Sequence, residues 1–393
     1  MARISRRLIR WVAVVLAAGL LLVVVTVVLV VMLVDPNEHK PRIEALVREQ
    51  IGRDLSLSGT LSWRIAPWLV VESAGGTLSN PPGFEGPPFA AWRRLRLGVR
   101  LWPLLEREFI VDRIAIDGLD LRLRRNAAGQ DNWTFATTPP EPDAAETRLQ
   151  VDALELTNSR VSFDDDAQGA HWRAEALAVS LRLPAGATAQ SVQVENVDLS
   201  ARVFGGPLSP QGVAVAFDAA RIGYAAGALQ LPEFAAKLND AEVSGALTAS
   251  LSPALSAKGR VDVAAPKLRE LLTAVGVAVP PTSDAAVLGR FKLASGFTLD
   301  ADRFASEGLA LQLDDTQITG AVQSPSLQQG SVRFDLQGDS IDIDRYLEPE
   351  GTASKPFELQ LAQLKALDAV GQLTFERATL GGIAIVGLTL KVE

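Results

Sequence analysis

The stretch RLRLGVRL at residues 94–101 alternates apolar side chains with basic ones or glycine, with a period of two. Its leucines and valine therefore fall on one side of an extended chain, and its arginines fall on the other. The stretch IAIDGLDLRLR at residues 114–124 shows the same alternation, and its parity changes at Gly118. A change of parity at a glycine predicts a β-bulge. Both stretches predict β-strands with one apolar face.

The same alternation continues along the chain, with Gly, Pro, Asn or Asp between the runs. Such runs occupy residues 154–163, 177–183, 192–203, 243–251, 261–265, 309–313, 318–322, 332–336 and 380–392. Two connections, LTNSRV at 156–161 and LDDTQI at 313–318, predict a strand, an Asn or Asp turn and a second strand. Short strands at regular spacing predict antiparallel meanders and a mostly β fold.

Signals for helices are few. Residues 41–51 predict a short helix, because Pro41 suits its first position and Gly52 suits its C-terminal cap. Residues 266–275 carry leucines at helical spacing, and residues 342–347 predict a single turn. Residues 136–147 include the Pro-rich, acidic stretch TTPPEPDAAET, which predicts an exposed loop.

The N-terminal region has the features of a membrane anchor. Residues 11–34, from Trp11 through Leu20 to Val34, carry no charge. As a helix they would be about 36 Å long, enough to cross a hydrocarbon core of about 30 Å. The preceding residues 1–10 contain no acid and four basic residues, Arg3, Arg6, Arg7 and Arg10. The positive-inside rule then predicts a single-pass protein with a cytoplasmic N-terminus and the bulk of the chain outside.

A cleaved signal peptide is the alternative for this region. Its apolar part would be shorter, about 7–15 residues, and a small-residue cleavage site would follow it. The residues before Asp35 offer no such site, which favours the uncleaved anchor.

The composition excludes several kinds of function. The 393 residues include no cysteine and two histidines, which excludes thiol chemistry, disulfides and most zinc sites and catalytic triads. The net charge is −8 although the first ten residues are basic, and an acidic body argues against nucleic acid as a partner. No nucleophile with a base and no cofactor motif is visible, so we expect neither an enzyme nor a bound cofactor.

The acidic runs at residues 164–166 and 314–315 could be considered as metal sites. Adjacent side chains of an extended segment point to opposite faces and do not converge on one ion. We therefore interpret both runs as solvated hairpin loops without a metal. His171, at the start of a strand, is interpreted as a surface residue.

A sheet with one apolar face needs a partner that covers this face. A second sheet would give a sandwich, and a curled sheet would give a trough whose apolar interior holds a ligand. Small aliphatic side chains suit either arrangement, and in a trough they leave room for acyl chains. The candidate lining residues are Leu95, Leu97, Val99, Leu119, Leu121, Leu123, Leu156, Leu177, Val179, Leu181, Leu311 and Leu313.

The charged residues that alternate with these candidates are expected on the other face. Asp120, Arg122 and Arg124 should therefore be exposed, and the arginines at 94, 96 and 100 should share one outer face. This outer face either pairs with acids on the next strand or forms a basic rim near anionic lipid headgroups.

Several longer stretches resemble the AsmA family of Gram-negative inner-membrane proteins. At the N-terminus these are the basic start and single span that end in DPN at 35–37, and IGRDLSLSGTLSWRIAPWLVVES at 51–73. A third is LRLGVRLWPLLEREFIVDRIAIDGLDLRLRRNAAGQDNWTF at 95–135. Further on are LQVDALELTNSRVSFDDD (149–166), LALQLDDTQITGAVQ (309–323) and SVRFDLQGDSIDIDRYLEP (331–349).

The resemblance implies an elongated, curved antiparallel sheet with an apolar groove, as in bridge-like lipid-transfer proteins, and no catalytic residues. It implies an inner-membrane protein that projects into the periplasm and contributes to outer-membrane biogenesis. It would do so either by conveying phospholipid along the groove or, as a non-enzymatic assembly factor, through contacts with outer-membrane assembly proteins.

The expected order is a cytoplasmic tail (1–10), a transmembrane helix (11–34), a β region (35–135), a loop (136–147) and a repeated β region (148–393). Members of the family usually continue further, and here an apolar strand at 386–392 runs to the last residue. The chain is therefore expected to be a truncated member.

Overall fold

The computed structural model describes residues 35–65, 69–100, 109–135, 149–184, 191–252, 254–349 and 368–392. These residues are mostly β-strand and belong to two compact units, Met1–Val151 and Asp152–Glu393. The expected membrane segment at 11–34 and the acidic loop at 136–147 lie outside the described residues. Within the described part of the chain, no helix is long and apolar enough to span a membrane.

The described part of unit 1 starts with the 3-10 turn η1 (Pro36–His39) and the helix α2 (Lys40–Ile51), which corresponds to the helix expected at 41–51. The Asp35 side chain accepts a hydrogen bond from the Asn37 backbone N–H at 2.8 Å, and thereby caps η1. Gly52 ends α2 with a φ of 67°, the left-handed conformation that glycine adopts without strain.

The strands of unit 1 form two short antiparallel groups, β2–β3–β6–β7 and β1–β4–β5–β8, and β9 runs parallel to β7. Their bounds are β1 (Leu55–Ser56), β2 (Leu61–Ile65), β3 (Leu69–Ser73), β4 (Gly76–Leu78), β5 (Ala90–Trp92), β6 (Arg94–Val99), β7 (Phe109–Asp117), β8 (Asp120–Arg125) and β9 (Leu149–Val151).

The bulge expected at Gly118 falls at a break between two strands. Gly118 has a φ of 67° and lies between the end of β7 and the start of β8. The change of parity in the sequence therefore marks an interruption of the strand.

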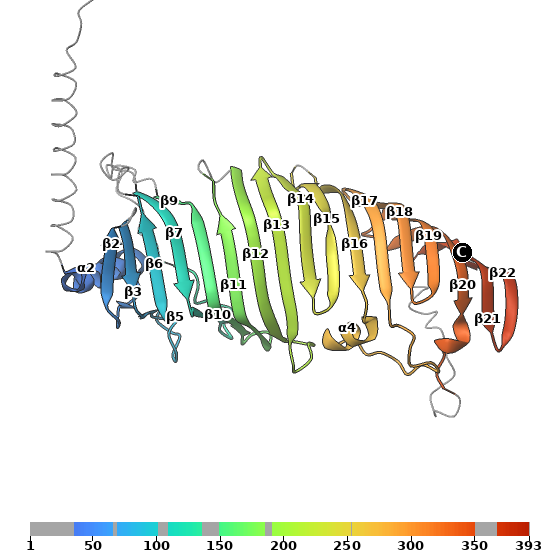
Figure 1. Ribbon diagram of the computed structural model, residues 1–393, viewed down its shortest axis with the longest axis horizontal. Coiled ribbons are helices and arrows are strands. Elements are labelled where there is room, and N and C mark those ends of the chain that lie inside the picture. Colours follow the sequence, from blue (N-terminus) through green and yellow to red (C-terminus); the bar gives the residue numbers. More distant parts are fainter. Residues whose placement is uncertain are drawn as a thin grey trace, which may run out of the picture. The chain divides into compact units, whose positions relative to one another are not determined.

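Unit 2 is one sheet in which each strand pairs with the next along the chain (Figure 1). All of these pairs are antiparallel except β20 and β21, which are parallel and are connected by residues 343–368. The bounds are β10 (Ala153–Asp165), β11 (Ala170–Arg182), β12 (Ser191–Gly205), β13 (Val213–Ala225), β14 (Ala228–Leu238), β15 (Ala241–Ser250), β16 (Ser256–Ala265), β17 (Phe291–Asp300), β18 (Arg303–Leu313), β19 (Thr316–Ser326), β20 (Ser331–Asp342), β21 (Ala369–Leu380) and β22 (Ile383–Val392).

Bulges keep the apolar side chains of the long strands on one face. Asn158, Ala176 and Asn196 have φ values of 49°, 50° and 49° inside β10, β11 and β12. Each adds one residue to its strand, so the alternation changes parity while the strand continues. The turn expected within LTNSRV is therefore a bulge, whereas LDDTQI does form the turn between β18 and β19.

One end of the unit 2 strands carries the helix α4 (Leu268–Ala274), within the helix expected at 266–275 (Figure 1). The short turn expected at 342–347 is the 3-10 helix η2 (Ile343–Arg345). Ala241 and Ala265, at this end of β15 and β16, are almost fully buried, and so is Val287 in the segment after α4. The best-packed part of unit 2 therefore lies at the α4 end of its strands.

Candidate functional site

One row of side chains crosses the whole sheet of unit 2. Residues directly opposed in neighbouring strands lie on the same face, so the register defines the row strand by strand. We call this set the apolar row; its members, from β10 to β22, are Leu156, Val179, Leu199, Phe217, Ala236, Val243, Val263, Leu293, Leu311, Ile318, Gly338, Phe375 and Leu388.

The apolar row is only partly covered. All of its members are half-buried except Gly338 and Phe375, which are buried. The interior of a β-sandwich is close-packed, with two sheets interdigitating their side chains. All strands of unit 2 within the described residues belong to one sheet. This arrangement favours the open face over the sandwich that the sequence also allowed.

The next row on the opposite face has a different chemistry. Its members are Glu155, Ser180, Asp198, Asp218, Ala235, Ser244, Asp262, Ala294, Ala310, Thr319, Gln337, Thr374 and Thr389. This polar row contains no aliphatic side chain larger than alanine. The sheet is therefore amphipathic across all of its strands, as the period of two predicts.

Phenylalanine rings lie over glycines of neighbouring strands on the apolar face. Phe375 is directly opposite Gly338 in the parallel strand β21, and a Cβ atom added to Gly338 would lie 2.3 Å from its ring. At three other glycines an added Cβ would meet a backbone carbonyl first and then a ring, at 2.7 Å for Gly371 and Phe334, 3.0 Å for Gly259 and Phe297, and 3.2 Å for Gly245 and Phe234. The rings therefore occupy the space that a side chain at these glycine positions would need. Sequence reasoning missed this feature, because it depends on the register between strands.

The structure brings several of the expected lining residues together. Leu156, Val179 and Leu311 belong to the apolar row, and Leu177, Leu181 and Leu313 lie on the same face. Leu313 is the last residue of β18, directly before the buried Asp314. In unit 1, β6 places three other candidates opposite Ile116, Ile114 and Val111 of β7; these are Leu95, Leu97 and Val99.

Strand β8 departs from the expected alternation. Leu119 precedes the strand, and Leu121 and Leu123 are half-buried to the same degree as Asp120, Arg122 and Arg124. The expectation that these charged residues are exposed is wrong. Arg122 pairs with Asp120 at 2.6 Å, and the segment around Asn132 covers the strand, since the Asn132 side chain bonds to the backbone of Arg122 and Arg124.

The acidic run at 164–166 ends β10 with Asp164 and Asp165 and begins the expected hairpin turn to β11 with Asp166. Asp164 contacts the exposed His171 at 2.8 Å. Asp165 is buried and accepts hydrogen bonds from the backbone N–H groups of Ala167 and Gln168 at 3.0 and 3.1 Å. Asp165 therefore stabilises the turn and is not solvated.

Asp314 is a second exception to the solvated interpretation. Its carboxylate is buried, and it accepts hydrogen bonds from the backbone N–H groups of residues 288–290 at 2.8 to 3.0 Å and from the Tyr346 hydroxyl at 2.7 Å. Burial raises the pKa of Asp314, but these donors together hold it below its ordinary value. Burial and the contact with Asp314 raise the pKa of Tyr346. Asp314 therefore ties the segment after α4 to the β18–β19 turn.

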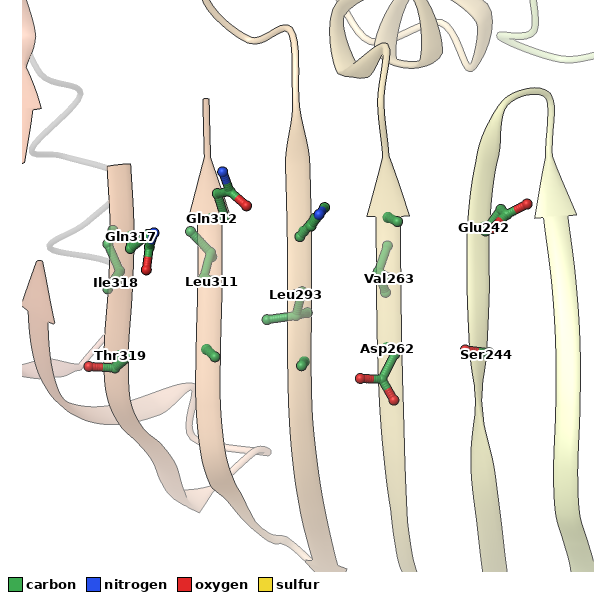
Figure 2. Close-up of a pocket in the computed structure, with 14 residues that line it drawn as sticks. Glu242, Ser244, Asp262, Val263, Leu293, Leu311, Gln312, Gln317, Ile318 and Thr319 are labelled. Carbon is green, nitrogen blue, oxygen red and sulfur yellow. The ribbon is translucent and has the colours of Figure 1, made fainter. Parts of the chain in front are cut away.

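The polar face of β15–β19 contains a hollow of about 530 Å³ (Figure 2). Most of its lining side chains belong to the polar row or the next row on that face, including Asp262, Lys292 and Gln312. Small residues such as Ala294 and Ala310 leave the space open. Within the described residues no group of His, Cys, Asp and Glu side chains is arranged to hold a metal ion.

The fold and the apolar row define a class of protein, a single long amphipathic β-sheet with an accessible apolar face. The sequence model of the AsmA family matches residues 7–205, about half of the chain, and the chain belongs to this family.

The chain is similar to Protein AsmA of Escherichia coli (strain K12), with 27% identity over 163 residues. The match covers 39% of this chain and 25% of that protein. No solved structure matches the chain.

Proposed function

We propose that the apolar face of unit 2 holds the acyl chains of phospholipid. The observation that carries this proposal is the apolar row, which continues through all thirteen strands while its side chains, except that of Phe375, stay half-buried. Apolar surface left in water costs about 25 cal/mol per Å², so a ligand that covers such a face gains free energy in proportion to the area it covers. Acyl chains match the face because the row contains no charged or hydrogen-bonding side chain.

The proposed setting is the inner membrane. Residues 11–34 would anchor the chain with its N-terminus in the cytoplasm, and the described units would lie in the periplasm. Together with membership of the AsmA family, this supports a role in outer-membrane biogenesis through the handling of lipid along the sheet.

Two substitutions on neighbouring strands test the proposal. The full chain is purified from membranes in detergent, and the lipid that accompanies it is quantified by mass spectrometry. Leu311→Asp should strongly reduce bound phospholipid, because an acyl chain cannot hydrate a carboxylate. Thr319→Asp is the matched control, since Thr319 lies in β19 on the polar face.

We expect the Thr319→Asp protein to retain the lipid of the parent protein. Equal lipid in the Leu311→Asp and Thr319→Asp proteins, with both folded, would contradict the proposal.

The second candidate function is that of an assembly factor that binds outer-membrane proteins by strand pairing. The observation that favours it is β22, which among the described strands pairs with β21. Its side chains Ile383 and Val386 are 67% and 85% exposed, a pattern suited to addition of a further strand. Val386→Lys should weaken capture of such a partner without changing bound lipid, because it replaces an exposed apolar side chain with a charged one.

A further inference from the structure

Three arginines in unit 1 share one carboxylate. Glu72 in β3 contacts Arg64 at 3.1 Å, Arg94 at 3.3 Å and Arg96 at 3.0 Å. The Glu72 side chain is 18% exposed, whereas those of Arg64, Arg94 and Arg96 are 71%, 48% and 47% exposed. The carboxylate therefore lies beneath three guanidinium groups that face solvent. We call these four residues the Glu72 cluster.

The register of strands β2, β3 and β6 brings the residues of the Glu72 cluster together. Glu72 is directly opposite Arg96 in β6, and Arg94 lies two residues further along the same strand, on the same face. On the other side of β3, Glu72 is opposite Ser62 in β2, and Arg64 lies two residues beyond it. The strands on either side of β3 therefore place their basic side chains on the face that carries Glu72.

The Glu72 cluster carries excess positive charge. Burial raises the pKa of Glu72, but the hydrogen bond from Arg96 and the charges of the three arginines hold it below its ordinary value. Glu72 is thus ionised at neutral pH and balances one of the three positive charges. The four side chains of the Glu72 cluster therefore sum to a charge of +2, on a chain whose net charge is −8.

The position of the cluster along the chain relates it to the proposed membrane anchor. The Asn37 side chain accepts a hydrogen bond from the Leu61 N–H at 2.9 Å, and Lys40 Nζ donates one to the Gly59 carbonyl at 2.6 Å. The start of β2 is therefore fixed to the residues that directly follow 11–34. Arg64 is three residues further along β2, about 10 Å at 3.3 Å per residue.

We propose that the Glu72 cluster is a binding site for the phosphate group of an anionic membrane lipid. Guanidinium groups match phosphate geometry with two parallel hydrogen bonds, and arginines near an anionic surface gain further from its potential. This inference rests on the proposed anchor at 11–34, but it is independent of lipid binding on the apolar face of unit 2. The site would hold unit 1 against the bilayer surface.

A unique label makes the inference testable, because the chain contains no cysteine. Ser62→Cys places a fluorophore on the face of the Glu72 cluster, and the full chain is reconstituted in nanodiscs that contain a headgroup-attached quencher. Quenching should be greater in discs that contain phosphatidylglycerol than in discs of phosphatidylcholine alone, and salt should reduce it.

Removal of a positive charge and removal of the negative charge should have opposite effects on docking, which distinguishes loss of binding from loss of structure. Removal of one arginine, as in Arg94→Gln or Arg96→Gln, should reduce the ratio of docked to undocked unit 1 about fivefold. Glu72→Gln should increase this ratio, because it removes the competing carboxylate, and a misfolded protein would not show such a gain. Arg260→Gln and Arg290→Gln are matched controls, since these arginines are paired with Asp262 and Asp315 in unit 2.

Equal quenching in both kinds of disc, or no change with the arginine variants, would overturn the inference. Addition of inorganic phosphate, compared with chloride at the same ionic strength, distinguishes a soluble phosphate ligand from a lipid headgroup. Release by phosphate but not by chloride, without any preference for phosphatidylglycerol, would assign the site to a soluble phosphate and overturn the lipid assignment. If the chain does not co-elute with the discs, both the proposed anchor and this inference are wrong. Loss of lipid from unit 2 alone would contradict the proposed function but neither the anchor nor this inference.

Discussion

The ring of Phe375 in β21 lies over Gly338 in β20, so that a Cβ atom on this glycine would be 2.3 Å from the ring. Gly338→Ala should therefore force the ring to move, which we expect to lower the free energy of unfolding by about 1–3 kcal/mol. Gly223→Ala is the control, because its Cβ would be 3.7 Å from its nearest neighbour. Thermal melts of the two proteins should differ, and equal melting temperatures would show that the ring adjusts freely.

Added bulk on the apolar row should affect ligand binding more than stability. In Leu156→Trp and Leu311→Trp, an open face should accept the larger ring with little change in melting temperature, while bound phospholipid decreases. A close-packed sandwich would lose about 1–3 kcal/mol from the same changes. Thr319→Trp on the polar face is the control for the lipid measurement. A large loss of stability in both leucine variants, with no lipid in the parent protein, would favour a covered face.

The guanidinium group of Arg53 in unit 1 should stabilise the fold in a way that the same charge on a lysine cannot. It is buried, lies 4.4 and 5.2 Å from the ring centroids of Phe135 and Phe89, and donates hydrogen bonds to the carbonyls of Asn132 and Thr134 at 2.8 and 3.1 Å. Arg53→Lys keeps the charge but removes the guanidinium nitrogen that donates both bonds and the planar group that lies beside the two rings.

We expect Arg53→Lys to cost about 2 kcal/mol, since it leaves buried carbonyls unsatisfied. The exposed Arg48, which pairs with Asp54, provides the control Arg48→Lys, with a change within about 0.5 kcal/mol. Chemical unfolding monitored by tryptophan fluorescence would measure both. Similar midpoints would argue against a specific role of the Arg53 guanidinium.

Asp314 should make part of the stability of unit 2 depend on pH. Its pKa is below the ordinary value of 3.8, so the ionised form stabilises the fold above that pH. This stabilisation should decrease as the pH falls below 3.8 through the lower folded-state value. Asp314→Asn should lower the free energy of unfolding by about 2 kcal/mol at neutral pH, because the new amide NH2 group faces N–H donors. It should also reduce the dependence of the melting temperature on pH below 3.8. Asp315→Asn, on an exposed carboxylate, should change little.

The proposed topology can be tested directly. A phosphatase that is active only outside the cytoplasm, fused to the C-terminus, should be active because the four N-terminal arginines retain the N-terminus inside. A fusion with a reporter that works only in the cytoplasm should be inactive. Activity of the cytoplasmic reporter would contradict the topology.

The one-sided strands could be predicted from sequence because the period of two assigns each residue to a face. Parity changes in the sequence marked real features, but they could not distinguish a bulge inside one strand, at Asn158, from a break between two strands, at Gly118. That distinction depends on which strand lies alongside, and a single strand carries no such information.

The same limit explains the missed contacts. Gly338 and Phe375 are 37 positions apart in the sequence, and nothing local indicates that one accommodates the other. Asp314 has the sequence of a solvated turn residue, and it is buried only because residues 288–290 and Tyr346 return to it. The arginines at 94 and 96 were correctly placed on one face, but the position of Glu72 between them and Arg64 required the register of β2, β3 and β6.

Because the apolar row is continuous, the number of strands determines the length of the apolar path along the sheet. Thirteen strands spaced about 4.8 Å apart give a path of roughly 58 Å along the sheet, about twice the thickness of a membrane's hydrocarbon core. Each antiparallel hairpin adds two members to the row and contacts only its neighbours, so one hairpin more or less would alter the path by roughly 10 Å while every remaining residue kept its face. Evolution or design could thus adjust the reach of such a protein in steps, as repeat proteins do, without rebuilding its core.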